Sequence, residues 1–434
     1  MVCTDTRDIK KGAVFFALKG PSFNGNTFAE KALELGCTYA VVDDDQCVKD
    51  RRYLLVPDVL ESLQALANYH RRMLKTRVIA ITGSNGKTTS KELLSAVLSK
   101  KYSVLATKGN LNNHIGVPLT LLSVIHSHEL AIVEMGANHI GEIAVLCEIA
   151  EPDFGLITNI GLAHLEGFGS EEGVVKGKTE LYQYLKNKNG LLFVNADNEL
   201  LCKRASGIRM ETYGTTNQAT VQGILVKTDP FVQLRWKRTQ ANKPLIAQPL
   251  TDTHLAGNYN FENVLAAACI GSHFGVEDVK INEALHEYVP SNSRSQLIEK
   301  GSCKILMDAY NANPSSMAAA IDNFSALPWL NKVLVLGDMY ELGSRSEEEH
   351  RTLLNLIGKS TYAEIFLVGK HFKAVAAAEP AAGSSSGAGS VRCFETAGEL
   401  CEYLNKHPLK NSSVLIKGSR AVGLEKVLAV FKEL

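Results

Sequence analysis

One short glycine-rich segment restricts the possible folds of this chain more than any other feature. An apolar strand pattern, VIAIT at 78–82, runs directly into GSNGKTT at 83–89, and leucines and valines at helical spacing follow. Glycines in such a turn let backbone N–H groups point at phosphate oxygens, and the start of the next helix also favours an anion. Ile81 stands where the standard motif has its first glycine. We therefore predict a shortened phosphate loop within an α/β sheet.

The phosphate loop supplies the groups that bind a nucleotide. We expect Lys87 to contact the β- and γ-phosphates of ATP, and we expect the Thr88 hydroxyl to bind Mg²⁺. An ordinary glycine-rich turn is the alternative, which GKTT directly after an apolar strand disfavours. The predicted nucleotide-binding segment comprises Gly83, Ser84, Asn85, Gly86, Lys87, Thr88 and Thr89.

Three further side chains are candidates from their positions, each with a structural alternative. Glu134 ends the apolar run LAIV at 130–133, and an acid at the carboxyl end of a parallel strand faces the ligand crevice, where it suits Mg²⁺. His164 follows another predicted strand, and Lys178 lies in a helical pattern. On pattern alone, a helix cap, a structural histidine and a solvated lysine remain the commoner explanations, so the pattern leaves all three open.

Alternating strands and helices predict three α/β domains. Residues 1–75 form a small N-terminal unit, and residues 76–289 form a central parallel-sheet domain that carries the phosphate loop. Residues 290–434 contain five strand candidates separated by helices, which indicates a Rossmann-like doubly wound sheet. Asn313 followed by Pro314 predicts a helix start, and the Gly/Ser/Ala-rich run at 381–390 predicts a surface loop.

The strand and helix candidates follow from apolar runs and from helical spacing. The strand candidates are 13–18, 39–42, 53–56, 78–82, 130–134, 154–157, 190–194, 231–236, 305–308, 332–336, 364–368, 391–394 and 413–417. The main N-terminal helices are expected at 28–35 and 59–74, and a late helix of the central domain is expected to follow the loop within 255–275.

Composition excludes several classes of protein. Lys+Arg and Asp+Glu both number 46 in 434 residues, so the chain has no overall basic field for nucleic acid. No apolar run approaches the roughly 18 residues of a membrane span, and no signal-peptide cleavage pattern is present, so we expect no membrane insertion. The nine cysteines are scattered and lack C-x-x-C, which favours reduced thiols in a cytoplasmic protein.

Seven sequence blocks resemble those of the Mur ligases, the ATP-dependent enzymes that build the peptide stem of peptidoglycan. Each block is moderately specific, but their order along nearly the whole chain is very specific. DTR at 5–7 and FALKG at 16–20 add the amino-terminal signature. The blocks are TGSNGKTTSKE (82–92), GNLNNHIGVPLTLL (109–122), EMGANHIGEI (134–143), NIGLAHLEGFGS (159–170), DAYNANPSSM (308–317), GDMYELG (337–343) with His350, and IKGSRAVGLEKV (416–427).

The resemblance implies a specific activity. The chain resembles the branch of the family that joins D-alanyl-D-alanine to UDP-N-acetylmuramoyl-tripeptide. This reaction uses ATP and Mg²⁺ and proceeds through an acyl phosphate intermediate. The resemblance implies that the first domain binds the UDP part of the substrate, the second ATP and the third the incoming dipeptide. We expect a monomer.

The resemblance also implies residue roles. Lys87, His164 and Lys178 are the implied catalytic residues. The implied metal ligands are Thr88, Glu134, His164 and Lys178, the last as the family lysine that is carbamylated. The implied nucleotide contacts outside the phosphate loop are Asn260, Asn263, Arg294 and Asp308, with Tyr259 standing where the family's G-x-H-N-x-x-N element has histidine. The implied substrate contacts are Thr6, Arg7, Asn110, Asn112, Asn113, Lys417, Ser419 and Arg420.

Alternatives come from the same class and from other classes. Folylpolyglutamate synthase uses the same phosphate loop and chemistry, but the 109–122 block and the DTR and FALKG signature argue against it. The tripeptide-forming relative is disfavoured because D-N-P-R is absent from the chain. A phosphate-loop nucleotide switch would hydrolyse ATP without a carboxylate acceptor. A non-catalytic scaffold is disfavoured, because such a protein does not need the combination of GKTT, Glu134, His164 and Lys178.

Overall fold

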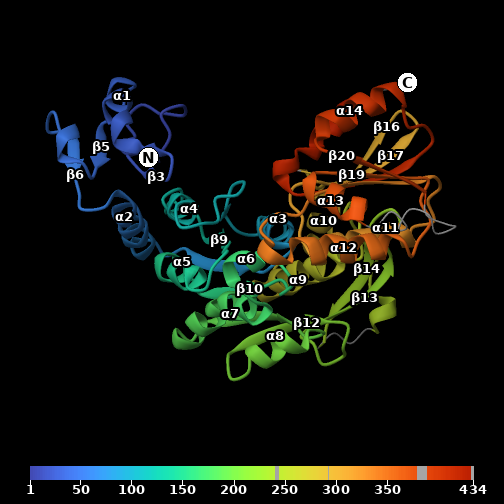
Figure 1. Cartoon of the computed structure of the whole chain (residues 1–434). Helices are drawn as coiled ribbons and strands as arrows, with labels where there is room; N and C mark the ends of the chain where they lie inside the picture. Colours follow the sequence, from blue (N-terminus) through green and yellow to red (C-terminus); the bar gives the residue numbers. More distant parts are fainter. Residues whose placement is uncertain (240–243, 292, 379–388, 432–434) are drawn as a thin grey trace.

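The computed structural model describes residues 1–239, 244–291, 293–378 and 389–431. The chain forms three α/β units, each built around its own sheet, which confirms the predicted three-domain α/β class. Figure 1 shows the N-terminal unit in blue and the C-terminal unit in orange and red at opposite ends of the central unit. Residues 381–388 of the predicted surface loop lie outside the described residues. No helix in the described ranges is long and apolar enough to cross a membrane.

The N-terminal unit is a four-stranded parallel sheet in the order β1-β2-β5-β6. Helix α2 (Val59–Met73) leaves this unit and packs on the central unit through α4 and α5. Asp58 caps α2 by accepting from the backbone N–H of Glu61 at 2.7 Å. The other elements are β1 (Val2–Cys3), β2 (Val14–Phe16), the hairpin β3 (Lys19–Gly20) and β4 (Phe23–Asn24), α1 (Ala29–Glu34), β5 (Tyr39–Val42) and β6 (Tyr53–Leu55).

The central unit is a nine-stranded sheet in the order β15-β14-β13-β12-β11-β10-β7-β9-β8. Its strands are β7 (Arg77–Thr82), β8 (Val104–Ala106), β9 (Leu130–Glu134), β10 (Phe154–Ile157), β11 (Leu191–Asn195), β12 (Met210–Gly214), β13 (Val221–Lys227), β14 (Gln233–Arg238) and β15 (Thr251–Asp252). Its helices are α3 (Lys87–Leu98), α4 (Gly116–Leu121), α5 (Glu142–Ala150), α6 (Leu165–Phe168), α7 (Glu171–Asn187), α8 (Glu199–Arg204), α9 (Asn260–His273) and α10 (Asp278–Glu287).

Both faces of the central strands are covered, which explains why they read as continuous apolar runs. Along β7, Val78 and Ala80 pack with α5 and α7, whereas Ile79 and Ile81 pack with α3 and α9. One edge departs from the predicted parallel arrangement, because β13, β14 and β15 pair antiparallel. Buried residues alternate with partly exposed ones in β14, and β13 ends in four exposed residues, as expected for an antiparallel edge with a solvated face.

The C-terminal unit is a six-stranded sheet in the order β16-β17-β21-β18-β19-β20, with β16 antiparallel to β17. Along β17, Ile305 and Met307 face the cluster that contains α14, whereas Leu306 faces the cluster that contains α11, α12 and α13. The sheet is therefore doubly wound, as predicted. Its elements are β16 (Gln296–Lys300), β17 (Cys303–Asp308), α11 (Pro314–Ala326), β18 (Lys332–Gly337), α12 (Ser346–Ile357), β19 (Glu364–Val368), α13 (Lys370–Ala378), β20 (Ser390–Phe394), α14 (Ala397–Lys406) and β21 (Ser413–Lys417).

Candidate active site

A cavity of about 1140 Å³ receives side chains from helix α2, the central unit and the C-terminal unit. It lies at the carboxyl ends of the central strands, the usual ligand position in open α/β sheets. Of the predicted site residues, it is lined by Ser84, Asn85, Gly86, Lys87, Thr88, Thr89, Asn110, Asn112, Asn113, Glu134, His164, Asn260, Asn263, Arg294, Asp308, Lys417 and Arg420. The structure therefore brings together residues that are far apart in the sequence.

Two glycines of the phosphate loop hold conformations that other residues rarely adopt. Gly83 has φ +140° and Gly86 has φ +77°. A Cβ atom on Gly83 would lie 2.1 Å from the Thr158 hydroxyl oxygen, and one on Gly86 would lie 2.6 Å from the Asn263 Oδ1. Both positions therefore require glycine for space as well as for backbone conformation. Gly83 itself does not line the cavity.

Lys87 is the first residue of α3, directly after the loop. Its Nζ donates to the carbonyl oxygens of Gly83 at 2.7 Å and Ser84 at 3.2 Å. Burial lowers the pKa of Lys87, and the Glu134 carboxylate partly opposes that shift. The ammonium is therefore held beside the loop carbonyls, at the wall of the cavity, and it forms no ion pair with any residue that the structure describes.

Glu134 lies at the end of β9, beside the phosphate loop. The Thr88 hydroxyl donates to its Oε2 at 2.9 Å, and the Asn112 side-chain amide donates to its Oε1 at 2.8 Å. Mg²⁺ in phosphate-loop enzymes typically uses one or two carboxylates, a hydroxyl, phosphate oxygens and water. Thr88 and Glu134 fit that set. Within the described ranges, no group of three or more His, Cys, Asp or Glu side chains is arranged to hold a metal ion.

Lys178 is not the solvated helix lysine that its pattern also allowed, because only 1% of it is exposed. Its Nζ donates to the Ala137 carbonyl oxygen at 3.0 Å and lies 5.1 Å from the centre of the Phe168 ring. Burial, and secondly the positive charge of Lys87, hold the pKa of Lys178 well below its ordinary value. The environment therefore favours a neutral amine. Lys178 lies behind Ala137, which lines the cavity.

His164 directly precedes α6 with φ +53°, and its Nδ1 contacts the Glu341 carboxylate of the C-terminal unit. Glu341 also lines the cavity. Sequence reasoning did not single out Glu341, although it lies in the GDMYELG block.

Two asparagines at the start of α9 form a short hydrogen-bonded chain. Asn263 donates to Oδ1 of Asn260 at 3.0 Å and accepts from the Ser90 hydroxyl at 3.0 Å. The preceding Tyr259 places its hydroxyl 3.0 Å from the Ser295 hydroxyl, which belongs to the C-terminal unit. The tyrosine at the family's histidine position thus contributes a contact between two units.

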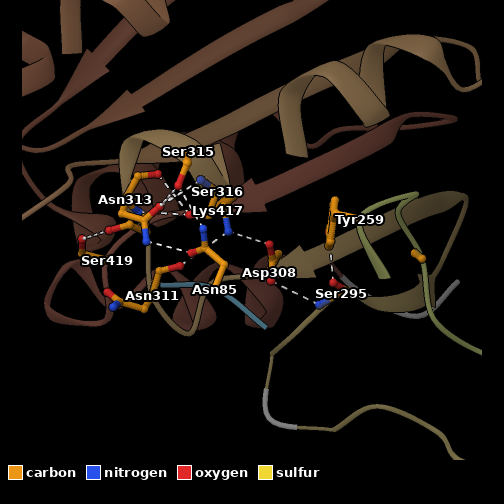
Figure 2. A network of polar contacts seen from close by, with 12 residues as sticks. Asn85, Tyr259, Ser295, Asp308, Asn311, Asn313, Ser315, Ser316, Lys417 and Ser419 are labelled. Carbon is orange, nitrogen blue, oxygen red and sulfur yellow. Dashed lines mark hydrogen bonds and ion pairs between the residues drawn. The ribbon is translucent and has the colours of Figure 1, made fainter. Parts of the chain in front are cut away.

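Figure 2 shows the polar network that joins the phosphate loop to the C-terminal unit. Asn313 donates from Nδ2 to Oδ1 of Asn85 at 2.8 Å, and Asn85 donates to the Ser315 hydroxyl at 2.9 Å. Sequence reasoning identified Asn313 only as a helix cap and did not identify Ser315. The DAYNANPSSM block was the available signal for both residues.

Positive side chains gather where the C-terminal unit meets the cavity. Lys417 donates to Asp308 Oδ2 at 2.5 Å, and the backbone N–H of Ser295 donates to Oδ1 of Asp308 at 3.2 Å. The Arg294 guanidinium lies 3.6 Å from the centre of the Tyr310 ring, and that of Arg420 lies 5.3 Å from the same centre. The ring of Tyr310 therefore holds two cations at one wall.

Other predicted substrate residues are placed differently. Thr6 and Arg7 do not line the cavity, and the exposed Arg7 pairs with Asp5 at 2.6 Å. Ser419 is buried outside the lining, where its hydroxyl accepts from the backbone N–H of Tyr340 at 3.1 Å. Asn113 lines the cavity, and its Oδ1 also accepts from the backbone N–H of Gly116 at 2.9 Å, within α4.

A glycine-rich phosphate loop beside an acidic strand end, with a third α/β unit closing over it, defines a class of multidomain ATP-binding enzyme. Three family models match the chain in order. "Mur ligase family, catalytic domain" matches residues 1–88, "Mur ligase middle domain" matches 81–271, and "Mur ligase, glutamate ligase domain" matches 293–420.

Curated relatives and solved structures agree with these models. A UDP-N-acetylmuramoyl-tripeptide–D-alanyl-D-alanine ligase of Bacillus subtilis (strain 168) is 34% identical, covering 98% of this chain and 92% of its own. The enzyme of that name from Escherichia coli (strain K12) is 34% identical, covering 100% and 93%. The chain therefore belongs to the Mur ligase family. Crystal structures of MurF from Acinetobacter baumannii (30% identity, TM-score 0.85, coverage 99% and 92%) and of MurF from Thermotoga maritima in complex with ADP (26%, 0.83, 99% and 96%) share its fold.

Proposed function

We propose that this Mur ligase joins D-alanyl-D-alanine to UDP-N-acetylmuramoyl-tripeptide with the energy of ATP, giving the UDP-muramoyl-pentapeptide precursor of peptidoglycan. Relatives named for that reaction match it at about a third identity over nearly the full chain. The observation that carries the proposal is the single cavity onto which the phosphate loop, Glu134 and the cations of the C-terminal unit all open. Such a cavity can bring the reacting ends of ATP and of two further reactants together.

The reaction must activate a carboxylate, which is a poor electrophile. Attack of the tripeptide carboxylate on the γ-phosphorus of ATP gives an acyl phosphate and ADP. The amine of the dipeptide, after losing a proton, attacks the acyl carbon to form a tetrahedral intermediate. Phosphate then leaves and the amide bond remains. Two anions approach each other in the first step, so positive charge at the cavity wall is the main requirement.

The charges at the cavity wall meet that requirement. Lys87 lies beside the loop that would cradle the phosphates, and Arg294 and Lys417 reach the cavity from the C-terminal unit. Thr88 and Glu134 would hold Mg²⁺, which when bound neutralises charge on the phosphates. Asn263 packs against Gly86 of the loop, and its side-chain amide donates to Oδ1 of Asn260. These roles rest on placement and on similarity to the family.

We also propose that Lys178 is carbamylated. The neutral amine attacks CO₂, the new N–C bond forms, and the proton lost from nitrogen passes to solvent. Burial favours the neutral amine that this reaction needs. The product would present oxygen atoms beside Ala137, and oxygen is the ligand type that Mg²⁺ prefers. His164 would be a further ligand on the same side of the site.

Substrate placement follows from the remaining residues. Asn110, Asn112 and Asn113 line the cavity and suit the muramoyl-tripeptide. Thr6 and Arg7 would bind the UDP part, away from the cavity. Arg420 and Lys417, with Ser419 holding the adjacent loop, suit the carboxylate of the dipeptide. The proposed domains are 1–75, 76–289 and 290–434. We propose a cytoplasmic monomer, because one chain supplies the whole cavity and all nine cysteines are free thiols.

The experiment that tests this function is a product analysis. The chain is incubated with ATP, D-alanyl-D-alanine and UDP-muramoyl-tripeptide carrying either diaminopimelate or lysine, and the masses are measured. A product equal to tripeptide plus dipeptide minus one water, with ADP and phosphate, is expected from at least one tripeptide. ATP turnover that is equal with and without the dipeptide would instead indicate a nucleotide switch. In a parallel incubation with ATP, a folate and glutamate, addition of glutamate to the folate would indicate the folylpolyglutamate synthase alternative.

A further inference from the structure

The contact between His164 and Glu341 joins two units of the protein inside the cavity. His164 belongs to the central unit and Glu341 to the loop after β18 in the C-terminal unit. Both residues have left-handed backbone conformations, with φ +53° for His164 and φ +63° for Glu341. A non-glycine residue in that region carries a conformational cost, and such residues concentrate at functional sites. Two of them facing each other indicate an arrangement that the fold maintains.

Hydrogen bonds hold the loop that carries Glu341 at each of the three preceding residues. Asp338 accepts from the backbone N–H groups of His371 and Phe372, both at 2.9 Å. The Met339 N–H donates to Nε2 of the buried His350 at 3.1 Å. The Tyr340 N–H donates to the Ser419 hydroxyl at 3.1 Å. The backbone therefore presents Glu341 in one orientation.

Residues on the His164 side of the contact also pack against the segment that carries Glu341. The Glu166 N–H donates to the Glu341 carbonyl oxygen at 3.3 Å. Gly343 has φ +55°, and a Cβ atom there would lie 3.4 Å from the Glu166 side chain. The Arg345 guanidinium lies 3.6 Å from the Glu171 carboxylate. Segment 341–345 thus packs along α6 and the start of α7, with Glu341 at its inner end.

The chemistry of the two groups sets the form of the imidazole. An ionised carboxylate can only accept, so the ring nitrogen that it contacts must carry the hydrogen. Nδ1 of His164 faces Glu341, which leaves Nε2 as the lone-pair nitrogen of the neutral ring. Histidines that ligate metals or accept protons are commonly oriented in this way by a carboxylate.

We propose that Glu341 is a positioning residue for His164: docking of the C-terminal unit brings a carboxylate to Nδ1, which fixes the Nδ1–H form and frees Nε2 for the reaction centre. This proposal rests on the proposed function for the role of His164, and it adds a link between domain docking and the chemical state of the site. When the C-terminal unit is undocked, His164 has no carboxylate at Nδ1, and the competent ring form is no longer imposed.

The test uses the full chain with Glu341→Leu, which removes the acceptor, and Glu341→Gln, whose amide oxygen can still accept from Nδ1–H. Glu348→Leu, an exposed residue near the same loop, is the matched control. Side-chain ¹⁵N NMR of the ligand-free protein, about two pH units above the ordinary imidazole pKa, reports which nitrogen carries the hydrogen. His164→Gln assigns the signal.

We expect a protonated Nδ1 and an unprotonated Nε2 in the wild type, in Glu341→Gln and in the control. Glu341→Leu should move the hydrogen to Nε2, the form that free histidine favours in water. An Nε2–H ring in the wild type, an unchanged signal in Glu341→Leu, or Glu341→Gln behaving like Glu341→Leu would overturn the proposal. In assays, Glu341→Leu should lower kcat about tenfold to a hundredfold with little change in KM for ATP. A wild type without ligase activity would refute the proposed function but leave the NMR result standing.

Discussion

Asn313 uses the two ends of its side-chain amide for two different tasks. Its Oδ1 accepts from the backbone N–H of Ser316 at 2.9 Å and so caps α11, while its Nδ2 donates to Oδ1 of Asn85 in the phosphate loop at 2.8 Å. The residue that starts a helix of the C-terminal unit therefore also holds the nucleotide loop of the central unit. Stability and nucleotide binding should both depend on it.

Replacing Asn313 by alanine should have both effects. Loss of the cap should lower the free energy of unfolding by about 1 kcal/mol, and loss of the contact with Asn85 should raise KM for ATP. Asn198→Ala is the matched control, because Asn198 caps α8 through the backbone N–H of Leu201 at 3.0 Å and does not line the cavity. The control should lose similar stability in denaturant titrations while KM stays unchanged. Equal KM values in the two variants would contradict the link between the units.

Replacing Lys87 by alanine should lower turnover by orders of magnitude without unfolding the protein. The ammonium donates to carbonyl oxygens of the loop backbone, and charge stabilisation of the transferring phosphoryl group is its expected role. Lys100→Ala, which removes an ammonium paired with Glu287 at the surface, is the control. Steady-state kinetics and circular dichroism measure the two properties. Wild-type turnover in a folded Lys87→Ala protein would remove the phosphate-loop assignment.

His350 should make stability fall as pH falls below neutrality. Burial lowers the pKa of His350 from its ordinary value, and its Nε2 must stay unprotonated to accept from the Met339 N–H. Below about pH 6.5, the unfolded chain takes up a proton that the folded chain resists, so the unfolded state gains stability. Part of the free energy of unfolding is therefore lost as pH drops from the ordinary imidazole pKa toward the lowered one.

The measurement is urea unfolding of the wild type, of His350→Gln and of His126→Gln, in steps between about pH 7.5 and about pH 5.5. His350→Gln should be less stable at the upper end and should show a shallower fall with acid. His126 is exposed, so its variant should follow the wild type. An acid slope that is the same in all three proteins would show that His350 is not held neutral.

Lys178→Ala should largely abolish ligation if the carbamylated side chain supplies oxygens to the site. Short carboxylic acids should partly restore the rate by occupying the vacated space, and removal of bicarbonate should reversibly inactivate the wild type. Lys176→Ala is the control, since Lys176 is exposed on the same helix. Near-normal turnover of Lys178→Ala, or no response to bicarbonate, would leave Lys178 as a buried structural lysine.

The central elements of the fold could be predicted from the sequence because they are buried on both faces. The strands Leu130–Glu134 and Phe154–Ile157 begin and end at the predicted residues, since turn residues bound each apolar run. Strands β8, β12, β13, β15 and β16 were not predicted. β15 has only two residues, and the other four are only partly buried, so apolar periodicity is weak in them.

The candidate site likewise contains some features that the sequence predicts and others that it does not. The phosphate loop and Glu134 follow from strand ends and loop glycines, which are local features of the sequence. The contacts of Asn85 with Asn313 and of His164 with Glu341 could not be predicted in this way. They form between units whose residues lie more than a hundred positions apart, and no local periodicity encodes how two separate sheets dock.

The most direct test of the account follows an oxygen atom of the acceptor carboxylate. The UDP-muramoyl-tripeptide is prepared with ¹⁸O in its terminal carboxylate and is converted with ATP and D-alanyl-D-alanine, and the released phosphate is analysed by mass spectrometry. An acyl phosphate requires one labelled oxygen to leave with phosphorus, so each new amide bond should yield one phosphate that contains ¹⁸O. Unlabelled phosphate formed in step with the amide would contradict carboxylate activation at the phosphate loop.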